Sequence, residues 1–164
     1  VLFRSFVTAP EISPLFAEVC AAQLDPVLRA LGGGELLELG PGTGRFAAGA
    51  LAAFRALGTP LTGCSLLEVS PDLRARQQAL LAGVDARAVA PRWLDSLPAP
   101  FRGVVFANEV IDALPCERFV MQGGAAWRLG VGRAGPAFGW RGRPADGACA
   151  GDAEFAAEIG RAHV

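Results

Sequence analysis

The stretch E-L-L-E-L-G-P-G-T-G, residues 35–44, decides the fold of this chain. A short apolar run meets an acidic residue, Glu38, and three glycines follow at alternate positions, Gly40, Gly42 and Gly44. Glycine has no Cβ atom, so the backbone can bend sharply here and a ligand can approach the main chain. Between a buried strand and a helix, such a turn is typical of folds that bind nucleotide-like cofactors.

The glycine turn is compatible with two cofactors. Counted from Gly40, the dinucleotide pattern G-x-G-x-x-G/A fails at Arg45, but counted from Gly42 it is satisfied by Ala47, so the turn alone leaves NAD open. The alternation of Glu38 with the glycines favours S-adenosylmethionine, which has no pyrophosphate and needs only room for its methionine part. A tight turn without any ligand is the remaining alternative.

A second acidic residue follows the next apolar run. In L-L-E-V-S-P, residues 66–71, Glu68 lies at the end of the expected second strand. A carboxylate there can accept hydrogen bonds from both ribose hydroxyls of an adenosine cofactor. The alternative is a solvated acid at a strand end. We also expect Trp93 and Leu94, in a loop after the third strand, to lie beside the adenine, with ordinary packing as the alternative for Trp93.

Polar residues follow the expected fourth strand in A-N-E-V-I-D-A-L-P, residues 107–115. Asn108, Glu109 and Asp112 come directly after the apolar run. Ligands of open parallel sheets bind beyond the carboxyl ends of the strands, so these side chains are candidates for the reaction centre. Two carboxylates suit a cationic substrate and can hold a guanidinium through charged hydrogen bonds. Asp112 could instead cap the turn that follows it.

Strands alternate with helices through the first two thirds of the chain, which predicts an α/β fold with a parallel sheet and right-handed crossovers. Ser13 before Pro14, and Ser70 before Pro71, are typical helix starts. Pro26 is expected to kink or divide the first helical region. We expect a loop at residues 8–14, strands at 35–39, 64–69, 84–89 and 104–107, and helices at 14–31, 46–57 and 71–81.

The pattern changes after residue 115. Two strands at 118–121 and 126–131 flank Gly123 and Gly124, which predicts a β-hairpin. Residues 130–151 are rich in glycine and proline and indicate a loop, with a further strand near 138–141. A helix is expected to begin at 152–158.

Composition excludes several classes of function. The chain has 164 residues, 52% of them hydrophobic, and a net charge of −1, which indicates a folded domain with a core. No basic stripe is present, so we expect no nucleic-acid partner. No apolar stretch approaches the ~20 residues of a membrane span. The four cysteines are far apart and no C-x-x-C occurs, so we expect buried or half-buried thiols and no metal site.

Both ends of the chain look foreign. Residues 1–5 and 159–164 match translations of common sequencing-adaptor DNA, so we expect an internal fragment whose residues 6–158 are the N-terminal part of a catalytic domain. This removes the single histidine, His163, from any catalytic role. An NAD-dependent oxidoreductase needs a proton donor near the nicotinamide, and the chain has no tyrosine and no other histidine.

Together these segments resemble the class I S-adenosylmethionine-dependent methyltransferases. More narrowly, they are similar to the family of the mitochondrial complex I assembly-factor arginine methyltransferase and its bacterial relatives. The resemblance extends from residue 6 to residue 120. It rests on F-V-T-A-P-E-I-S-P-L-F-A-E, E-L-G-P-G-T-G, L-L-E-V-S-P-D-L-R-A-R-Q and A-N-E-V-I-D-A-L-P-C-E-R-F-V, which occur in the family's order.

The resemblance implies a Rossmann-like sheet, S-adenosyl-L-methionine as cofactor, and a protein substrate with a target arginine. It also implies a link to assembly of respiratory complex I, in the bacterial cytoplasm or, in a eukaryote, the mitochondrial matrix. The family's sheet order is 3-2-1-4-5-7-6, and we expect strands five to seven to be missing, so that the fragment is inactive alone. A non-catalytic assembly factor that keeps the cofactor fold, and an NAD-dependent oxidoreductase, are the alternatives.

Overall fold

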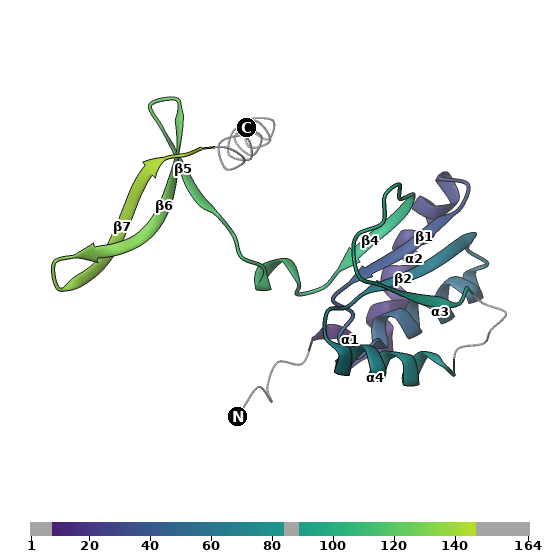
Figure 1. Ribbon diagram of the computed structural model, residues 1–164. Coiled ribbons are helices and arrows are strands. Elements are labelled where there is room, and N and C mark those ends of the chain that lie inside the picture. Colours follow the sequence, from purple (N-terminus) through teal and green to yellow (C-terminus); the bar gives the residue numbers. More distant parts are fainter. Residues whose placement is uncertain (1–7, 84–88, 147–164) are drawn as a thin grey trace. The chain divides into compact units, whose positions relative to one another are not determined.

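The computed structural model of this chain describes residues 8–83 and 89–146 (Figure 1). These residues belong to two compact units, which divide between Ala113 and Leu114. The first unit contains the α/β fold that the sequence predicts. The second unit contains the expected hairpin and the further strand expected near residues 138–141.

The first unit is built on a four-stranded sheet with the order β3-β2-β1-β4. All three strand pairs are parallel, which confirms the predicted sheet. The central position of β1 brings the glycine turn at its carboxyl end next to the ends of both β2 and β4. The strands are β1 (Gly34–Leu39), β2 (Leu61–Leu67), β3 (Pro91–Leu94) and β4 (Gly103–Ala107).

Two of the helices begin where serine and proline stand together. The Ser13 hydroxyl accepts a hydrogen bond from the Leu15 N–H, and the Ser70 hydroxyl accepts one from the Leu73 N–H. Each serine satisfies a backbone donor that the first helical turn leaves without a partner. The helices are α1 (Ala9–Ile12), α2 (Pro14–Ala30), α3 (Arg45–Leu57), α4 (Pro71–Leu81) and the 3₁₀ helix η1 (Ile111–Ala113).

One face of the sheet carries the core. Buried residues of α2, α3 and α4 pack in a single cluster with buried residues of β1 and β2. Three aromatic rings, Phe16, Phe46 and Phe106, lie together in it, and the rings of Phe46 and Phe106 stack with centroids 3.7 Å apart. The fully buried members include Ala21, Leu28, Leu36, Ala47, Ala50 and Leu66.

The edge of the sheet at β4 is open in the described part of the chain. There β4 pairs only with β1, and Val105 in its middle is 52% exposed. An edge strand presents backbone N–H and C=O groups that another strand can pair with. The four-stranded sheet agrees with the expectation that the described residues contain strands one to four of the class I order.

Two predicted elements differ from the structure, and the first helical region is not divided at Pro26. The third strand is Pro91–Leu94, so Trp93 and Leu94 lie within a strand and not in a loop after it. Of the range 84–89, in which the strand was expected, only residue 89 is described, and it is not in a strand. Residues 9–12 form the short helix α1 in place of a loop. Pro26 does not divide α2, because it lies on the exposed side of the helix, where water can bond the carbonyl that its missing N–H leaves free.

The second unit is a three-stranded antiparallel sheet with the order β5-β6-β7. The predicted hairpin at Gly123 and Gly124, both with positive φ, is confirmed. The further strand expected near 138–141 is confirmed by the third strand of this sheet, which begins at Ala137 and ends at Pro144. The loop expected around it was wrong for most of its described part, because β6 and β7 pair across it in spite of their glycines. The strands are β5 (Arg118–Gln122), β6 (Ala125–Ala134) and β7 (Ala137–Pro144); the helix expected at 152–158 lies outside the described residues.

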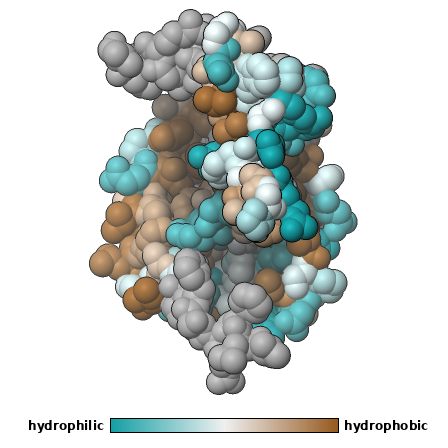
Figure 2. All heavy atoms as spheres, turned by 90° about the vertical axis from the view of Figure 1, so that its left-hand side faces the viewer, coloured by the Kyte–Doolittle hydropathy of each residue, from teal (hydrophilic) through white to brown (hydrophobic). Residues whose placement is uncertain are grey.

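This second sheet exposes large apolar side chains. Val131, Phe138 and Trp140 are 65%, 80% and 57% exposed. They share one face with Arg118, whose guanidinium lies 4.2 Å from the centroid of the Trp140 ring. Figure 2 shows hydrophobic residues, in brown, at the molecular surface beside hydrophilic ones, in teal. Among the described residues of this sheet none is buried.

Candidate functional site

The three glycines of the turn have positive φ angles and different neighbours. Gly40, Gly42 and Gly44 have φ values of 57°, 56° and 88°. A Cβ atom at Gly40 would lie 2.8 Å from Val110, and one at Gly44 would lie 3.2 Å from Gln77, so both glycines allow close packing. A Cβ atom at Gly42 would meet nothing within 4 Å. Only Gly42 therefore leaves open space that a ligand can occupy.

Glu38 is a buried carboxyl group with one unused oxygen. Its side chain is 4% exposed, and no hydrogen-bond donor of the described residues reaches Oε2. Burial raises its pKa from 4.5 to about 8, while a hydrogen bond from the Ala47 backbone opposes the shift. A buried carboxyl group without a partner is costly, and a cationic group beside it would stabilise the charged form. The ammonium of a bound amino acid fits this position.

A cavity of about 320 Å³ opens at the carboxyl ends of β1 and β4. It brings together six residues that the sequence predicts for one site. They come from the end of β1, from the glycine turn and from the segment after β4. The six are Glu38, Gly40, Gly42, Asn108, Glu109 and Asp112.

Glu109 has an unusual backbone conformation. Its φ is 54°, and it is the only residue other than glycine with a positive φ in the described ranges. A side chain in the left-handed region costs of order 1 kcal/mol, and such residues gather at functional sites. Its carboxylate and that of Asp112, which lies in η1, are both exposed at the cavity. Two acids there can hold a cation.

Glu11 also lines this cavity, although sequence analysis did not select it. It belongs to α1 and accepts a hydrogen bond from the Thr43 hydroxyl in the glycine turn. Its other carboxylate oxygen lies 3.1 Å from the Arg45 guanidinium at the start of α3. These contacts fix α1 against the turn. The signal in the sequence was an acidic residue inside P-E-I-S-P, but nothing local indicates its distant partners.

Glu68 lies outside this cavity and lines a second one of about 300 Å³, together with Leu94. It is 7% exposed. One carboxylate oxygen accepts a hydrogen bond from the Ser70 N–H at 2.9 Å, and the other accepts one from Gln77 Nε2 at 3.2 Å. Each oxygen keeps a lone pair, so the carboxylate can still accept hydroxyl groups of a ligand.

Trp93 lies in β3 and packs against the core cluster. Its indole Nε1 donates a hydrogen bond to Gln77 Oε1 at 2.9 Å. Gln77 was another residue that sequence analysis missed. Leu73, Gln77 and Leu81 stand four residues apart on α4, and this spacing indicates that position 77 faces inward.

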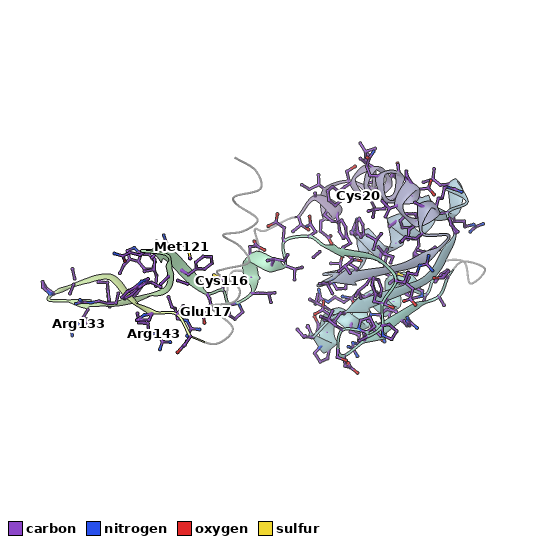
Figure 3. All side chains as sticks on the ribbon, turned by 90° about the horizontal axis from the view of Figure 1, so that it is seen from above. Cys20, Cys116, Glu117, Met121, Arg133 and Arg143 are labelled. Carbon is purple, nitrogen blue, oxygen red and sulfur yellow. The ribbon has the colours of Figure 1, made fainter. Side chains whose placement is uncertain are left out.

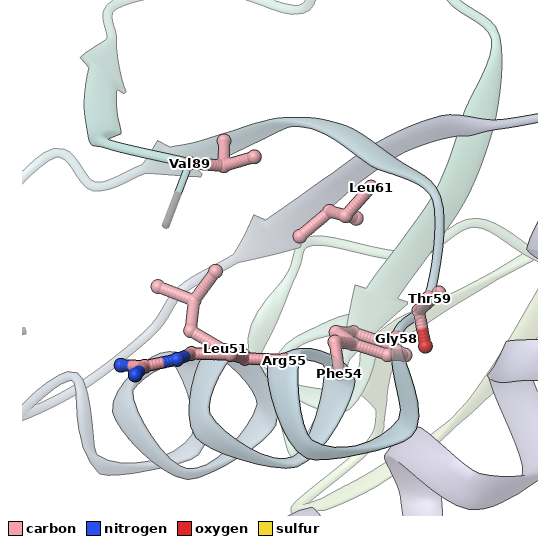
Figure 4. A pocket seen from close by; sticks show the side chains of 7 residues that line it. All are labelled: Leu51, Phe54, Arg55, Gly58, Thr59, Leu61 and Val89. Atoms are coloured by element: carbon pink, nitrogen blue, oxygen red, sulfur yellow. The ribbon is translucent and has the colours of Figure 1, made fainter. Parts of the chain in front are cut away.

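A third cavity, of about 280 Å³, lies between α3 and β2 (Figure 4). Apolar side chains such as Leu51, Phe54 and Leu61 dominate its lining, and none of the predicted site residues contributes to it. No cluster of His, Cys, Asp or Glu that could hold a metal ion occurs in ranges 8–83 and 89–146. In the same ranges no helix is long and apolar enough to cross a membrane.

The described cysteines are free thiols in different surroundings. Cys64 is buried in β2, and burial, with the charges of Glu38 and Glu35, raises its pKa to about 12. It therefore stays a neutral core residue. Cys20 is half-buried, but Cys116 is exposed, so the expectation of buried or half-buried thiols was wrong for Cys116 (Figure 3).

The raised pKa of Glu38 makes the stability of the protein depend on pH. Between pH 4.5 and about 8 the unfolded chain releases this proton while the folded chain keeps it, so the free energy of unfolding falls as pH rises. Glu38→Gln removes this dependence. As the pH rises from 5 to 8, we expect the free energy of unfolding of the variant to increase relative to that of the wild type. The total change in this difference is on the order of 4 kcal/mol, from ~1.4 kcal/mol for each unit.

Urea unfolding at several pH values measures this difference. Glu18→Gln, at an exposed position on α2, is the control and is expected to follow the wild type. A constant difference between Glu38→Gln and the wild type over this pH range would contradict the assignment of the titration to Glu38.

A family profile described as "Putative S-adenosyl-L-methionine-dependent methyltransferase" matches residues 15–158. Curated relatives include the mouse and human proteins named "Protein arginine methyltransferase NDUFAF7, mitochondrial". The mouse protein is 31% identical over 140 residues, 70% of this chain and 32% of its own length. The human protein is 30% identical over the same shares. The chain thus spans about a third of these curated relatives.

Two solved structures from Burkholderia thailandensis are also similar. One is a COG1565 superfamily member and "likely methyl transferase" bound to S-adenosyl-homocysteine. It is 41% identical, with a TM-score of 0.65, and the match covers 91% of this chain and 39% of that one. The other, a COG1565 superfamily protein, is 42% identical with a TM-score of 0.64, over 94% of this chain and 41% of that one. The likeness includes both the sequence and the fold.

Proposed function

The chain belongs to the family of S-adenosyl-L-methionine-dependent methyltransferases, and from this premise we propose that it binds this cofactor at the glycine turn and takes part in methylating an arginine of a protein substrate. The observation that carries the proposal is the cavity in which Glu38 and Gly42 meet Glu109 and Asp112. Glu38 suits an amino-acid cofactor, and Glu109 and Asp112 suit a cationic substrate.

The residues present fit the methionine part of the cofactor. The unpartnered Oε2 of Glu38 can accept a hydrogen bond from its ammonium group, and that charge would lower the pKa of Glu38. Gly42 leaves the open space that the chain of the ligand needs. Glu68 would hold the ribose hydroxyls, and Trp93 and Leu94 the adenine. When bound, the cofactor supplies an activated methyl group on a sulfonium.

In this proposal Glu109 and Asp112 bind the substrate, and Asn108 lies beside them. An arginine guanidinium is protonated in water, so its nitrogen is a poor nucleophile until carboxylates orient it. Glu109 holds the guanidinium so that one nitrogen lone pair faces the methyl group. With the cofactor bound, the methyl group would pass to that nitrogen as its bond to the sulfonium sulfur breaks and leaves the electron pair on sulfur. The nitrogen would give up one proton to a carboxylate or to water. The two negative charges offset the positive charge that develops on the nitrogen.

Methylation assays on full-length protein test the arginine substrate. Labelled cofactor, the candidate protein and mass spectrometry of the product would identify the methylated residue. Names of the mitochondrial relatives support arginine as the acceptor. The link to complex I assembly, the bacterial cytoplasm or mitochondrial matrix as location, and the inactivity of residues 6–158 alone are further parts of the proposal. Methylation of lysine, or of no protein, would contradict it.

A valine at Gly42 should block the cofactor without unfolding the sheet. Its side chain would enter the cavity, and the strain of a positive φ would add a cost in stability. Gly32→Val is the matched control, because Gly32 has a φ of 69° and open space around it but lies outside the cavity. We expect both variants to lose similar stability and only Gly42→Val to lose affinity for S-adenosylhomocysteine, by at least ~10-fold.

Isothermal titration calorimetry measures this affinity, and thermal melting measures the stability. Normal binding of S-adenosylhomocysteine by Gly42→Val would show that Gly42 only forms the backbone turn and does not face the cofactor. Equal loss of affinity in Gly32→Val would show that the effect arises from a general loss of stability.

A further inference from the structure

Gln77 is fully buried in α4, with an exposed fraction of 0%. Glutamine is rarely buried to this degree, and a buried amide is costly unless its hydrogen bonds are made. An apolar residue of similar size would fill the same space without that requirement. The three hydrogen bonds that Gln77 makes therefore point to a use beyond packing.

Trp93 fixes the orientation of the Gln77 amide. The indole N–H can only donate, so the atom 2.9 Å from it is the amide oxygen. The amide nitrogen must then face the opposite way. It donates to the Gly42 carbonyl at 2.7 Å and to the Glu68 carboxylate at 3.2 Å.

These bonds connect three segments that follow or form different strands. Gly42 lies after β1, Glu68 lies after β2, and Trp93 lies in β3. Gly44 makes the connection possible, because a Cβ atom there would lie 3.2 Å from Gln77 Cγ and 3.5 Å from its Cα. One amide group thus sets the spacing between the glycine turn and the acid after the second strand.

We propose that Gln77 is a positioning residue for cofactor recognition: it holds the Glu68 carboxylate and the Gly42 carbonyl at the separation that accepts the ribose and the methionine part together. This inference rests on the proposed function, since it assumes that Glu68 binds ribose hydroxyls. Gln77 does not touch the cofactor in this role and acts through Glu68 and Gly42.

The test compares two ligands, S-adenosylhomocysteine and its 2′-deoxy analogue, by calorimetry with the full chain. The wild type should prefer the hydroxylated ligand by about tenfold, the effect of one charged hydrogen bond. Gln77→Met keeps the length of the side chain but loses all three hydrogen bonds. It should bind S-adenosylhomocysteine at least about tenfold more weakly and lose most of its preference for the 2′-hydroxyl.

Two further variants test whether weaker binding arises only because the protein has lost its fold. Gln77→Glu keeps the acceptor for Trp93 and nearly the same shape, but it places an acceptor against Glu68 and the Gly42 carbonyl; it should also lose the preference. Gln78→Met, at the exposed neighbouring position on α4, should behave as the wild type in both measurements. Circular dichroism and melting temperature show which variants are folded.

The outcomes separate the two proposals. If Gln77→Met or Gln77→Glu binds both ligands more weakly but keeps the wild-type ratio between them, Gln77 is merely structural and the inference is overturned. If the wild type binds S-adenosylhomocysteine with no preference for the 2′-hydroxyl, the role of Glu68 fails and the inference fails with it. If the wild type binds neither ligand, the proposed function itself is overturned.

Discussion

Glu109→Gln is expected to slow methyl transfer by roughly 100-fold or more, the effect of losing ~3 kcal/mol of transition-state stabilisation. The amide keeps the shape of the side chain and tolerates the same backbone, whose φ is 54°. It removes the charge that orients a guanidinium and offsets the positive charge growing on its nitrogen. Affinity for the cofactor should stay unchanged, because Glu109 is assigned to the substrate end of the cavity.

Single-turnover methylation with the full-length protein and its protein substrate measures the rate. Asp112→Asn should also slow transfer, since Asp112 lines the same cavity. Glu18→Gln, an exposed acid on α2, is the control and should have the wild-type rate. Equal rates for the wild type and both site variants would remove these acids from the mechanism and favour a non-catalytic assembly factor.

Glu68→Ala is expected to weaken cofactor binding by roughly 100-fold, because two hydrogen bonds to the ribose, at ~1.5 kcal/mol each, are lost. The structure adds a second consequence. The Ser70 N–H and the Gln77 amide both lose an acceptor, so the variant should also melt at a lower temperature. Calorimetry with S-adenosylhomocysteine measures the affinity at a temperature where the variant is folded.

Asp95→Ala is the matched control for Glu68. Asp95 lines the same cavity, but its side chain is 89% exposed and pairs with Arg74 at the surface. Its removal should change the affinity little, since exposed ion pairs contribute less than about 1 kcal/mol. Unchanged affinity in Glu68→Ala would contradict the assignment of this acid to the ribose.

The fold was predictable where local signals and tertiary packing agree. Helix α4 has the predicted bounds, Pro71–Leu81, because a serine cap and a proline fix its start. The strand expected at 84–89 lies outside the described residues except for residue 89, and the third strand of the described sheet is Pro91–Leu94. Val84, Ala86 and Ala88 alternate with Asp85 and Arg87, a period of two that favoured the earlier range, whereas β3 begins with a proline. Proline is tolerated as the first residue of a strand, and β3 lies at the sheet edge.

The candidate site was predictable in its central part. The turn after β1 and the acids after β4 lie together because these strands are neighbours in a parallel sheet. Glu11 and Gln77 were not predictable, because their partners in the turn, Thr43 and Gly42, are 32 and 35 residues away along the chain. No local pattern encodes contacts over such separations.

The edge position of β4 divides the cavity into two halves that should differ in amide hydrogen exchange. In the described sheet β1 pairs on both sides, but β4 pairs only with β1. Deuterium should therefore replace the amide protons of β4 faster than those of β1, since local opening at an edge requires less free energy. The glycine turn follows β1, where slow exchange is expected, whereas Asn108 and Glu109 follow β4, where faster exchange is expected. On the proposed assignment, the residues that hold the cofactor would already be ordered in the free chain. The order of those that hold the substrate would depend on what pairs with the edge of β4.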